Sequence, residues 1–155
     1  MYLTGGATAV LYGWRSTTVD VDLRLDPERD ELLRALPALK ERLSINIEFA
    51  SPADFIPVKE GWESRSPFVM QRGRVAVYHF DLYAQALAKI ERGHKQDLGD
   101  VAAMIERGLV DRKRLGDYFS AIAPSLYRFP AIDESSFRRA VEKIVDESTG
   151  NENPI

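Results

Sequence analysis

The feature that most constrains this fold is a strand over residues 19–23 that carries two acids. Its aliphatic residues alternate with Asp20 and Asp22, so both carboxylates project from one face of the strand. Adjacent anions repel each other, and each resists burial unless it is paired or metal-bound. A divalent cation between them would relieve the repulsion, and carboxylate oxygens suit Mg²⁺ or Mn²⁺. The alternative is a polar strand face in water.

A glycine turn precedes this strand. Gly5 and Gly6 end an apolar beginning and lead into a short helix over residues 7–12, which Gly13 closes. Glycines at such a turn let the backbone approach a ligand, and the start of a helix offers N–H groups and a positive dipole end to an anion. We therefore predict a phosphate-binding turn followed by a metal-binding strand, the combination that transfer of a nucleotide requires.

Composition limits the class of protein. The 155 residues are 45% hydrophobic and 29% charged, as in one globular domain with a core of its own. The absence of cysteine excludes disulfides and thiolate metal sites and is compatible with a reducing cytoplasm, where we expect the protein to work. A net charge of −3 argues against strong non-specific binding to nucleic acid, and no apolar run reaches membrane-spanning length.

The order of the glycine turn and the two-acid strand carries a family resemblance. Gly5-Gly6 followed by Asp20-x-Asp22 between aliphatic residues resembles the signature of the DNA polymerase β-type nucleotidyltransferase superfamily. More narrowly, residues 3–7 and 15–22 (LTGGA and RSTTVDVD) are similar to the minimal and AbiEii-like nucleotidyltransferases of bacteria, many of which are toxin components or their relatives. The superfamily often has serine where this chain has Gly6. A hydroxyl that touches a phosphate would then come from Thr4 or Thr8, or be absent.

A later strand offers a third acid. In the strand over residues 44–50, Ile45 and Ile47 face one way while Asn46 and Glu48 face the other. Glu48 is therefore the candidate for a third carboxylate beside the first two, as a metal ligand or general base. A glutamate in solvent is an equal alternative, and Asp54 in the following turn is a weaker substitute for Glu48.

Other segments are predicted to be structural. A leucine-rich helix begins at Asp26-Pro27, and Pro37 within it predicts a kink or two short helices. Residues 57–71 read as a loop in which Trp62 either stacks on a base or, as we favour, anchors the loop on the core. His79 lies in the next strand and is expected to pack rather than to act in catalysis.

Two later helices, separated by Gly93-His94, carry charges at helical spacing. By itself this pattern indicates a helical hairpin with its charges in water. The segment Lys89-x-x-Arg92-x-x-Lys95-x-Asp97-x-x-Asp100 nevertheless resembles the later motif of AbiEii-like nucleotidyltransferases, where a helical lysine and a downstream aspartate complete the site. The resemblance implies that Lys89 contacts the nucleotide phosphates and that Asp97 orients a neighbour, with Asp100 as the alternative.

We therefore predict an α/β (α+β) fold, a mixed-sheet nucleotidyltransferase core with C-terminal helices. Residues 1–80 would form the core, residues 81–147 a helical portion that completes the site, and residues 148–155 a flexible tail. The predicted catalytic residues are Asp20, Asp22, Glu48, Lys89 and Asp97, and the predicted metal ligands are Asp20, Asp22 and Glu48. The predicted nucleotide-binding residues are Gly5, Gly6, Thr8, Arg15 and Lys89.

The resemblance also implies a reaction and its partners. With Mg²⁺ (or Mn²⁺) as cofactor, a nucleoside monophosphate would move from an NTP to a hydroxyl acceptor, an RNA end or a protein side chain. A toxin–antitoxin role, with an antitoxin-type protein partner and no membrane, belongs to the same expectation. The alternative is a catalytically degenerate protein of this fold that binds nucleotide or a partner protein without turnover.

The start of the chain bears on the sheet. Relatives often have a helix before the first strand, whereas here the sequence begins almost on that strand, so we expect the helix to be absent or removed by truncation. If the first strand lies at an edge of the sheet, its unpaired backbone groups would promote oligomerisation.

Overall fold

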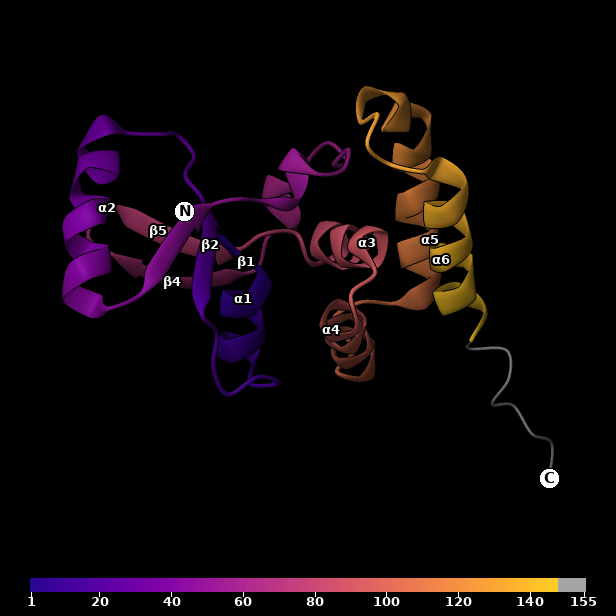
Figure 1. Ribbon diagram of the computed structural model, residues 1–155, viewed down its shortest axis with the longest axis horizontal. Helices are drawn as coiled ribbons and strands as arrows, with labels where there is room; N and C mark the ends of the chain where they lie inside the picture. The colour runs from indigo at the N-terminus through magenta and orange to yellow at the C-terminus, as the bar shows by residue number, and fades with distance from the viewer. Residues whose placement is uncertain (148–155) are drawn as a thin grey trace.

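The computed structural model of the protein describes residues 1–147 and contains one mixed five-stranded sheet (Figure 1). The strands are β1 (Tyr2–Thr4), β2 (Asp20–Arg24), β3 (Asn46–Phe49), β4 (Phe68–Arg72) and β5 (Val75–His79), in the order β3-β2-β1-β5-β4. β1 is antiparallel to β2 and parallel to β5, while β2 and β3 are parallel. The predicted mixed-sheet α/β fold is confirmed. The expectation of an open edge at the first strand is wrong, because β1 lies at the centre of the sheet.

The helices divide into two groups along the molecule. They are α1 (Gly5–Tyr12), α2 (Asp30–Leu43), α3 (Leu82–Arg92), α4 (Lys95–Glu106), α5 (Arg112–Ile122) and α6 (Glu134–Asp146). Figure 1 shows α1 and α2 beside the sheet and α3 to α6 gathered at the other end, with α3 and α4 nearest the sheet. None of the helices within residues 1–147 has the length and apolar character needed to cross a membrane. The predicted tail, residues 148–155, lies outside the described residues.

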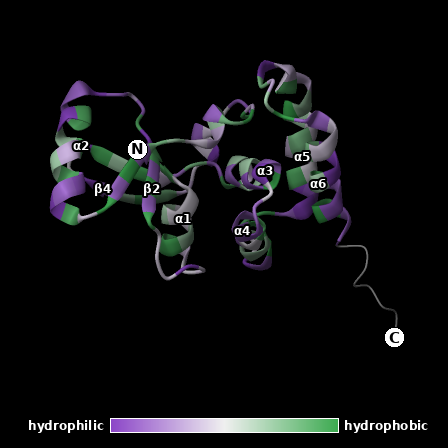
Figure 2. Cartoon of the chain, in the orientation of Figure 1, coloured by the Kyte–Doolittle hydropathy of each residue, from purple (hydrophilic) through white to green (hydrophobic). Residues whose placement is uncertain are grey.

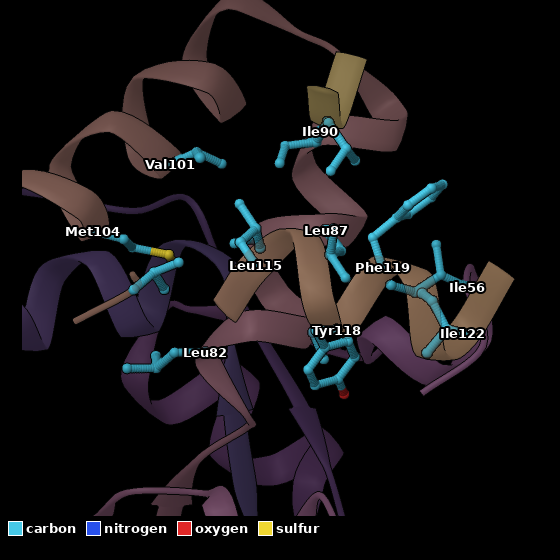
Figure 3. Packing of buried hydrophobic residues seen from close by; sticks show 14 of the residues in the cluster. Ile56, Leu82, Leu87, Ile90, Val101, Met104, Leu115, Tyr118, Phe119 and Ile122 are labelled. Atoms are coloured by element: carbon cyan, nitrogen blue, oxygen red, sulfur yellow. The ribbon is translucent and has the colours of Figure 1, made fainter. Parts of the chain in front are cut away.

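The main hydrophobic core lies among the later helices and not over the sheet. Leu87 and Ile90 of α3 pack with Leu115 and Phe119 of α5 (Figure 3). Apolar residues alternate with polar ones around α5 and α6, as amphipathic helices require (Figure 2). By contrast, α2 has no fully buried residue. The helical half therefore supplies most of the buried apolar surface, and α3 connects this core to the sheet.

Two predicted boundaries around α2 and β4 are wrong. The helix predicted from Asp26-Pro27 begins at Asp30, where Asp30 and Glu31 place acids in its first turn and complement the helix dipole. It continues through Pro37 as one helix, so two short helices do not form. The predicted loop over residues 57–71 ends earlier, because β4 begins at Phe68 and pairs with β5 through a tight turn at Gly73, whose φ is +57°.

The favoured interpretation of Trp62 is confirmed. Its side chain is only 9% exposed, and its ring stacks on Phe80 with ring centroids 4.3 Å apart. Tyr2 of β1 meets the same indole edge-on at 4.7 Å, and the guanidinium of Arg24 lies 5.2 Å from it. Trp62 thereby attaches the segment between β3 and β4 to the centre of the sheet and to the beginning of the helical half.

Replacing the indole of Trp62 should lower the stability of the protein. Trp62→Ala removes the stack on Phe80 and leaves a cavity, so we expect the free energy of unfolding to fall by about 3–5 kcal/mol. Trp62→Phe retains a ring and should cost less than half as much. Urea unfolding followed by circular dichroism measures both changes, and a loss below about 1 kcal/mol for Trp62→Ala would contradict the anchoring role.

Candidate active site

The predicted acids share one face of the sheet. β2 and β3 pair in parallel, with Asp22 opposite Glu48 and Asp20 opposite Asn46. The Asn46 side-chain amide donates to Asp20 Oδ1 at 2.7 Å and to Glu48 Oε1 at 3.0 Å. The structure thus brings Glu48 beside the acid pair, as its strand position predicted, and sequence reasoning missed the amide that links two of the three carboxylates.

Asp22 is harder to ionise than an ordinary aspartate, because its pKa is raised. It is half-buried, and burial is the largest cause that raises its pKa above the usual range. The negative charges of Glu48 and Asp20 raise the pKa further, while Arg92 and Lys89 offset part of the rise. The folded protein therefore holds three acids together at an electrostatic cost, which is the arrangement that a bound cation relieves.

The glycine turn is the first turn of α1, since the helix begins at Gly5 and not at residue 7 as predicted. Gly5 has a φ of +61°, and a Cβ at this position would lie 2.7 Å from Asp22 Oδ2. Both the backbone conformation and the close carboxylate therefore require glycine. The Gly5 N–H donates to Gln85 Oε1 of α3 at 3.0 Å, which ties the helix start to the helical half.

The hydroxyls near this turn are placed differently from the prediction. Thr8 is fully buried, and its Oγ1 lies 3.0 Å from His79 Nδ1 and 3.2 Å from Gln85 Nε2, which donates to it. A phosphate cannot reach Thr8 there, so its assignment to nucleotide binding is corrected. Thr4 lines the pocket beside Gly5, and its hydroxyl has no hydrogen-bond partner within residues 1–147. His79 packs against α1, as predicted.

A third hydroxyl lies against Gly6. A Cβ on Gly6 would be 2.0 Å from Thr18 Oγ1 and 2.8 Å from Thr18 Cβ, so no side chain fits while Thr18 is present. Thr18 Oγ1 donates to the carbonyl of Asp20 at 2.9 Å, which connects the turn to the acid strand. Thr18, which was not among the predicted sources, thus places a hydroxyl beside the position where the resembled superfamily often has serine. The loop path that brings them together leaves no signal in the sequence.

The charges of the helical hairpin are buried, and not in water. Lys89, Asp97 and Asp100 are 5%, 3% and 2% exposed. Lys89 Nζ donates to Asp100 Oδ2 at 2.6 Å and to Asp97 Oδ1 at 3.3 Å. The lysine and the downstream aspartates of the resembled motif therefore form one buried group, in which Asp97 and Asp100 both hold the ammonium in place.

Two arginines complete this group. Arg15 contacts Asp100 through Nε at 2.8 Å and through Nη2, and Trp14 Nε1 donates to the same carboxylate at 3.0 Å. Arg92 donates two hydrogen bonds to Asp97, from Nε to Oδ2 at 2.7 Å and from Nη2 to Oδ1 at 2.6 Å. Burial alone would raise the pKa of Asp97, but the hydrogen bonds from Arg92 and the charges of Lys89 and Arg92 outweigh it and lower the pKa.

A pocket opens between the acid strand and α3. Asp22 and Gly5 line one side of it, and Lys89 and Arg92 line the other, around a volume of about 130 Å³. Opposite charges thus face each other across the same space. Gln85, which sequence reasoning also missed, is another lining residue, and its side chain donates to the Phe80 carbonyl at 2.8 Å. A lone glutamine among the apolar residues of α3 was the available signal.

Two carboxylates of this site have the ligand type and the number that suit a divalent cation. Within residues 1–147 no group of three or more acidic or histidine side chains is arranged to hold a metal ion. Mg²⁺ is commonly bound by one or two carboxylates together with substrate phosphates and water. Asp20 and Asp22, on the same face of β2, supply two such carboxylates. The ionised form of Asp22 is destabilised by burial and by the neighbouring acids, and a cation would stabilise it.

The raised pKa of Asp22 gives a stability test. Because the folded-state pKa lies above the unfolded value, ionisation destabilises the fold as pH rises through it, and the effect disappears below about pH 4. Asp22→Asn should therefore stabilise the metal-free protein at pH 7 by about 0.2–1 kcal/mol, the range for a pair of side chains on neighbouring strands, here two like charges. Thermal unfolding at pH 7 and pH 3.5 measures it, with exposed Asp117→Asn as the matched control. A destabilised Asp22→Asn protein at pH 7 would contradict the repulsion.

The contact of Gly6 with Thr18 is testable by a double-mutant cycle. Gly6→Ala places a methyl group on the Thr18 hydroxyl, so the free energy of unfolding should fall by about 1–3 kcal/mol. In a Thr18→Gly background the same substitution should cost almost nothing. Gly99→Ala, in α4 with open space around it, is the control and should stabilise by up to about 1 kcal/mol. Equal costs in both backgrounds would refute the contact.

Comparison with known proteins agrees with this geometry. The family model described as "Nucleotidyltransferase of unknown function (DUF6036)" matches residues 2–146. No curated protein and no solved structure matches the chain. The match spans the sheet, the glycine turn, the acid strand and the helical hairpin, and the chain belongs to this nucleotidyltransferase family.

Proposed function

We propose that this protein is a metal-dependent nucleotidyltransferase that moves a nucleoside monophosphate from an NTP to a hydroxyl and releases pyrophosphate. One observation carries the proposal. Asp22, with its pKa raised by burial and by two neighbouring acids, lines a pocket whose other side is lined by Lys89 and Arg92. Groups of opposite sign that face one small space suit a ligand that combines a cation with polyanionic phosphates.

The acids would hold the cofactor. Asp20 and Asp22 would bind Mg²⁺ or Mn²⁺, and Glu48 would act as the general base that accepts the proton of the attacking hydroxyl. When bound, the cation would neutralise the phosphate oxygens and the charge that develops during transfer. Asn46 supports this role because its amide fixes the orientation of Asp20 and Glu48.

The cations and the glycine turn would hold the triphosphate. Two of the three N–H groups of Lys89 are directed to Asp97 and Asp100, so the third can reach a phosphate. Arg92 uses Nε and Nη2 on Asp97, and its Nη1 has no hydrogen-bond partner within the described chain. Gly6 would present its N–H group at the start of α1, whereas the Gly5 N–H is taken by Gln85 and Gly5 would only let the backbone approach the phosphates. Thr4 would supply the hydroxyl first assigned to Thr8. Arg15 would contact a phosphate from beside Gly6, because its Nη1 lies 3.7 Å from the place that a Cβ on Gly6 would take.

The acceptor and the biological role extend the proposal. We infer an RNA end or a protein side chain as acceptor, and a relationship to the AbiEii-like enzymes with a toxin–antitoxin role in the cytoplasm and an antitoxin-type partner. The residues that support this relationship are the turn at Gly5-Gly6, the Asp20-x-Asp22 strand and the Lys89–Asp100 helical motif.

A second candidate is a catalytically degenerate nucleotide-binding protein. The observation in its favour is that Lys89 and Arg15 are already engaged by buried Asp97 and Asp100, so part of their charge is neutralised before any nucleotide arrives. Such a protein would bind NTP with Mg²⁺ and would not release pyrophosphate. Binding and turnover therefore have to be measured separately.

A transfer assay with matched variants separates these functions. The protein is incubated with each α-labelled NTP, Mg²⁺, and a total RNA pool or a protein extract. We expect label to be transferred by the wild type and by Asp117→Asn, and to fall by at least about 100-fold in Asp20→Asn/Asp22→Asn because charge stabilisation in the transition state is lost. The double variant should remain folded, since repulsion is removed.

The possible outcomes assign the function. If the double variant transferred label at the wild-type rate, the assignment of Asp20 and Asp22 as metal ligands would be wrong. Absence of transfer by every protein, with Mg²⁺-dependent NTP binding that the double variant loses, would establish the degenerate alternative. Absence of both transfer and binding would leave the two aspartates as a polar strand face.

A further inference from the structure

The pocket has a second, apolar wall that the proposed chemistry does not use. Ala50, Pro52 and Phe55 form it together with Ala88 of α3, on the segment that follows β3. Phe55 is the largest side chain of this wall, and 56% of it is exposed. A pocket with charged groups on some of its residues and an aromatic ring on another matches a ligand that has a polyanionic end and a flat apolar end.

The backbone that carries Phe55 is held firmly. Residues 52–54 form a 3-10 turn that a reciprocal cap closes, since the Ser51 N–H and Oγ donate to Asp54 Oδ2 at 2.7 and 3.2 Å. The Phe55 N–H then donates to the Pro52 carbonyl at 3.0 Å, and Ser51 and Pro52 are buried. The exposed ring is therefore carried by a backbone that is held in place at the edge of the pocket, which lowers the backbone entropy lost on binding.

Phe55 differs from the aromatic residues that pack the protein. Trp62 and Phe80 stack on each other in the core, and the exposed Phe68 of β4 meets the ring of Tyr78 at 5.6 Å. Phe55 has no ring contact within residues 1–147. An exposed ring without an aromatic neighbour, fixed beside the pocket that holds Asp22, contributes little to folding and is available to a ligand.

We propose that Phe55 is the platform on which the base of the nucleotide stacks. The inference rests on the proposed function and adds the orientation of the substrate: phosphates between Gly5 and Arg92, base on Phe55. Aromatic rings bind all four bases because every base has a π face. Ser51, a polar residue of the same pocket wall, hydrogen-bonds to Asp54 and is therefore already engaged.

The test compares a nucleotide with a ligand that has no base. Calorimetric titration with ATP and with inorganic tripolyphosphate, each with Mg²⁺, is carried out on the wild type and on Phe55→Ala. We expect Phe55→Ala to weaken ATP binding about 5- to 100-fold, the range for loss of one base–aromatic stack, and to leave tripolyphosphate binding unchanged. Phe55→Tyr should retain the ATP affinity, and Phe68→Ala, an equally exposed phenylalanine away from the pocket, should change neither ligand.

Each contrary result identifies what fails. Unchanged ATP affinity in Phe55→Ala, with binding lost in Asp20→Asn/Asp22→Asn, would overturn the platform and leave the proposed function intact. Equal weakening of ATP and tripolyphosphate would also overturn it, because the loss would then not depend on a base. A wild type that binds neither ligand would overturn the proposed function itself and the platform with it. Thermal unfolding of Phe55→Ala excludes misfolding as the cause.

Discussion

Two buried carboxylates, Asp97 and Asp100, determine how the parts of this protein meet. Asp100 is 2% exposed and accepts hydrogen bonds from Trp14, Arg15 and Lys89, which come from the loop before β2 and from α3. A buried carboxylate without such partners would cost about 3–5 kcal/mol, enough to remove much of the stability of a small domain. The path of the loop into the acid strand and the packing of α4 on α3 therefore depend on the same few charges.

α3 links this constraint to the site. One side of the helix packs Leu87 and Ile90 into the main core, and another presents Lys89 and Arg92 to the pocket. Gln85 on the same helix bonds the first N–H of α1. The hydrophobic core, the glycine turn and the cations are all attached to α3. The packing of this helix, and not a flexible loop, therefore sets the position of the cations relative to the acids of β2.

Local patterns predicted much of this arrangement, and long-range contacts could not be predicted. Alternation in residues 19–23 placed Asp20 and Asp22 on one face, and the glycine turn marked the start of α1, because both features depend on neighbours in the chain. Spacing alone suggested that Lys89 and Asp97 lie in water, since burial is decided by the elements that cover a helix. The contact between Gly6 and Thr18 likewise depends on the course of a loop, which no periodicity records.

The charge distribution gives the site a direction. The ion-pair group around α3 contains three cations, Arg15, Lys89 and Arg92, and two acids, and Glu91 of the same helix also lines the pocket. The opposite face of β2 and β3 carries three acids, Asp20, Asp22 and Glu48, and the amide of Asn46. Arg92 and Lys89 partly stabilise the charge of Asp22 from across the pocket. In the proposed function, a phosphate group with its divalent cation would meet complementary charge with the cation toward Asp22 and the phosphate oxygens toward Lys89 and Arg92. Burial of Lys89, which is 5% exposed, strengthens that preference, because water and salt weaken the interactions of a buried charge less than those of an exposed one.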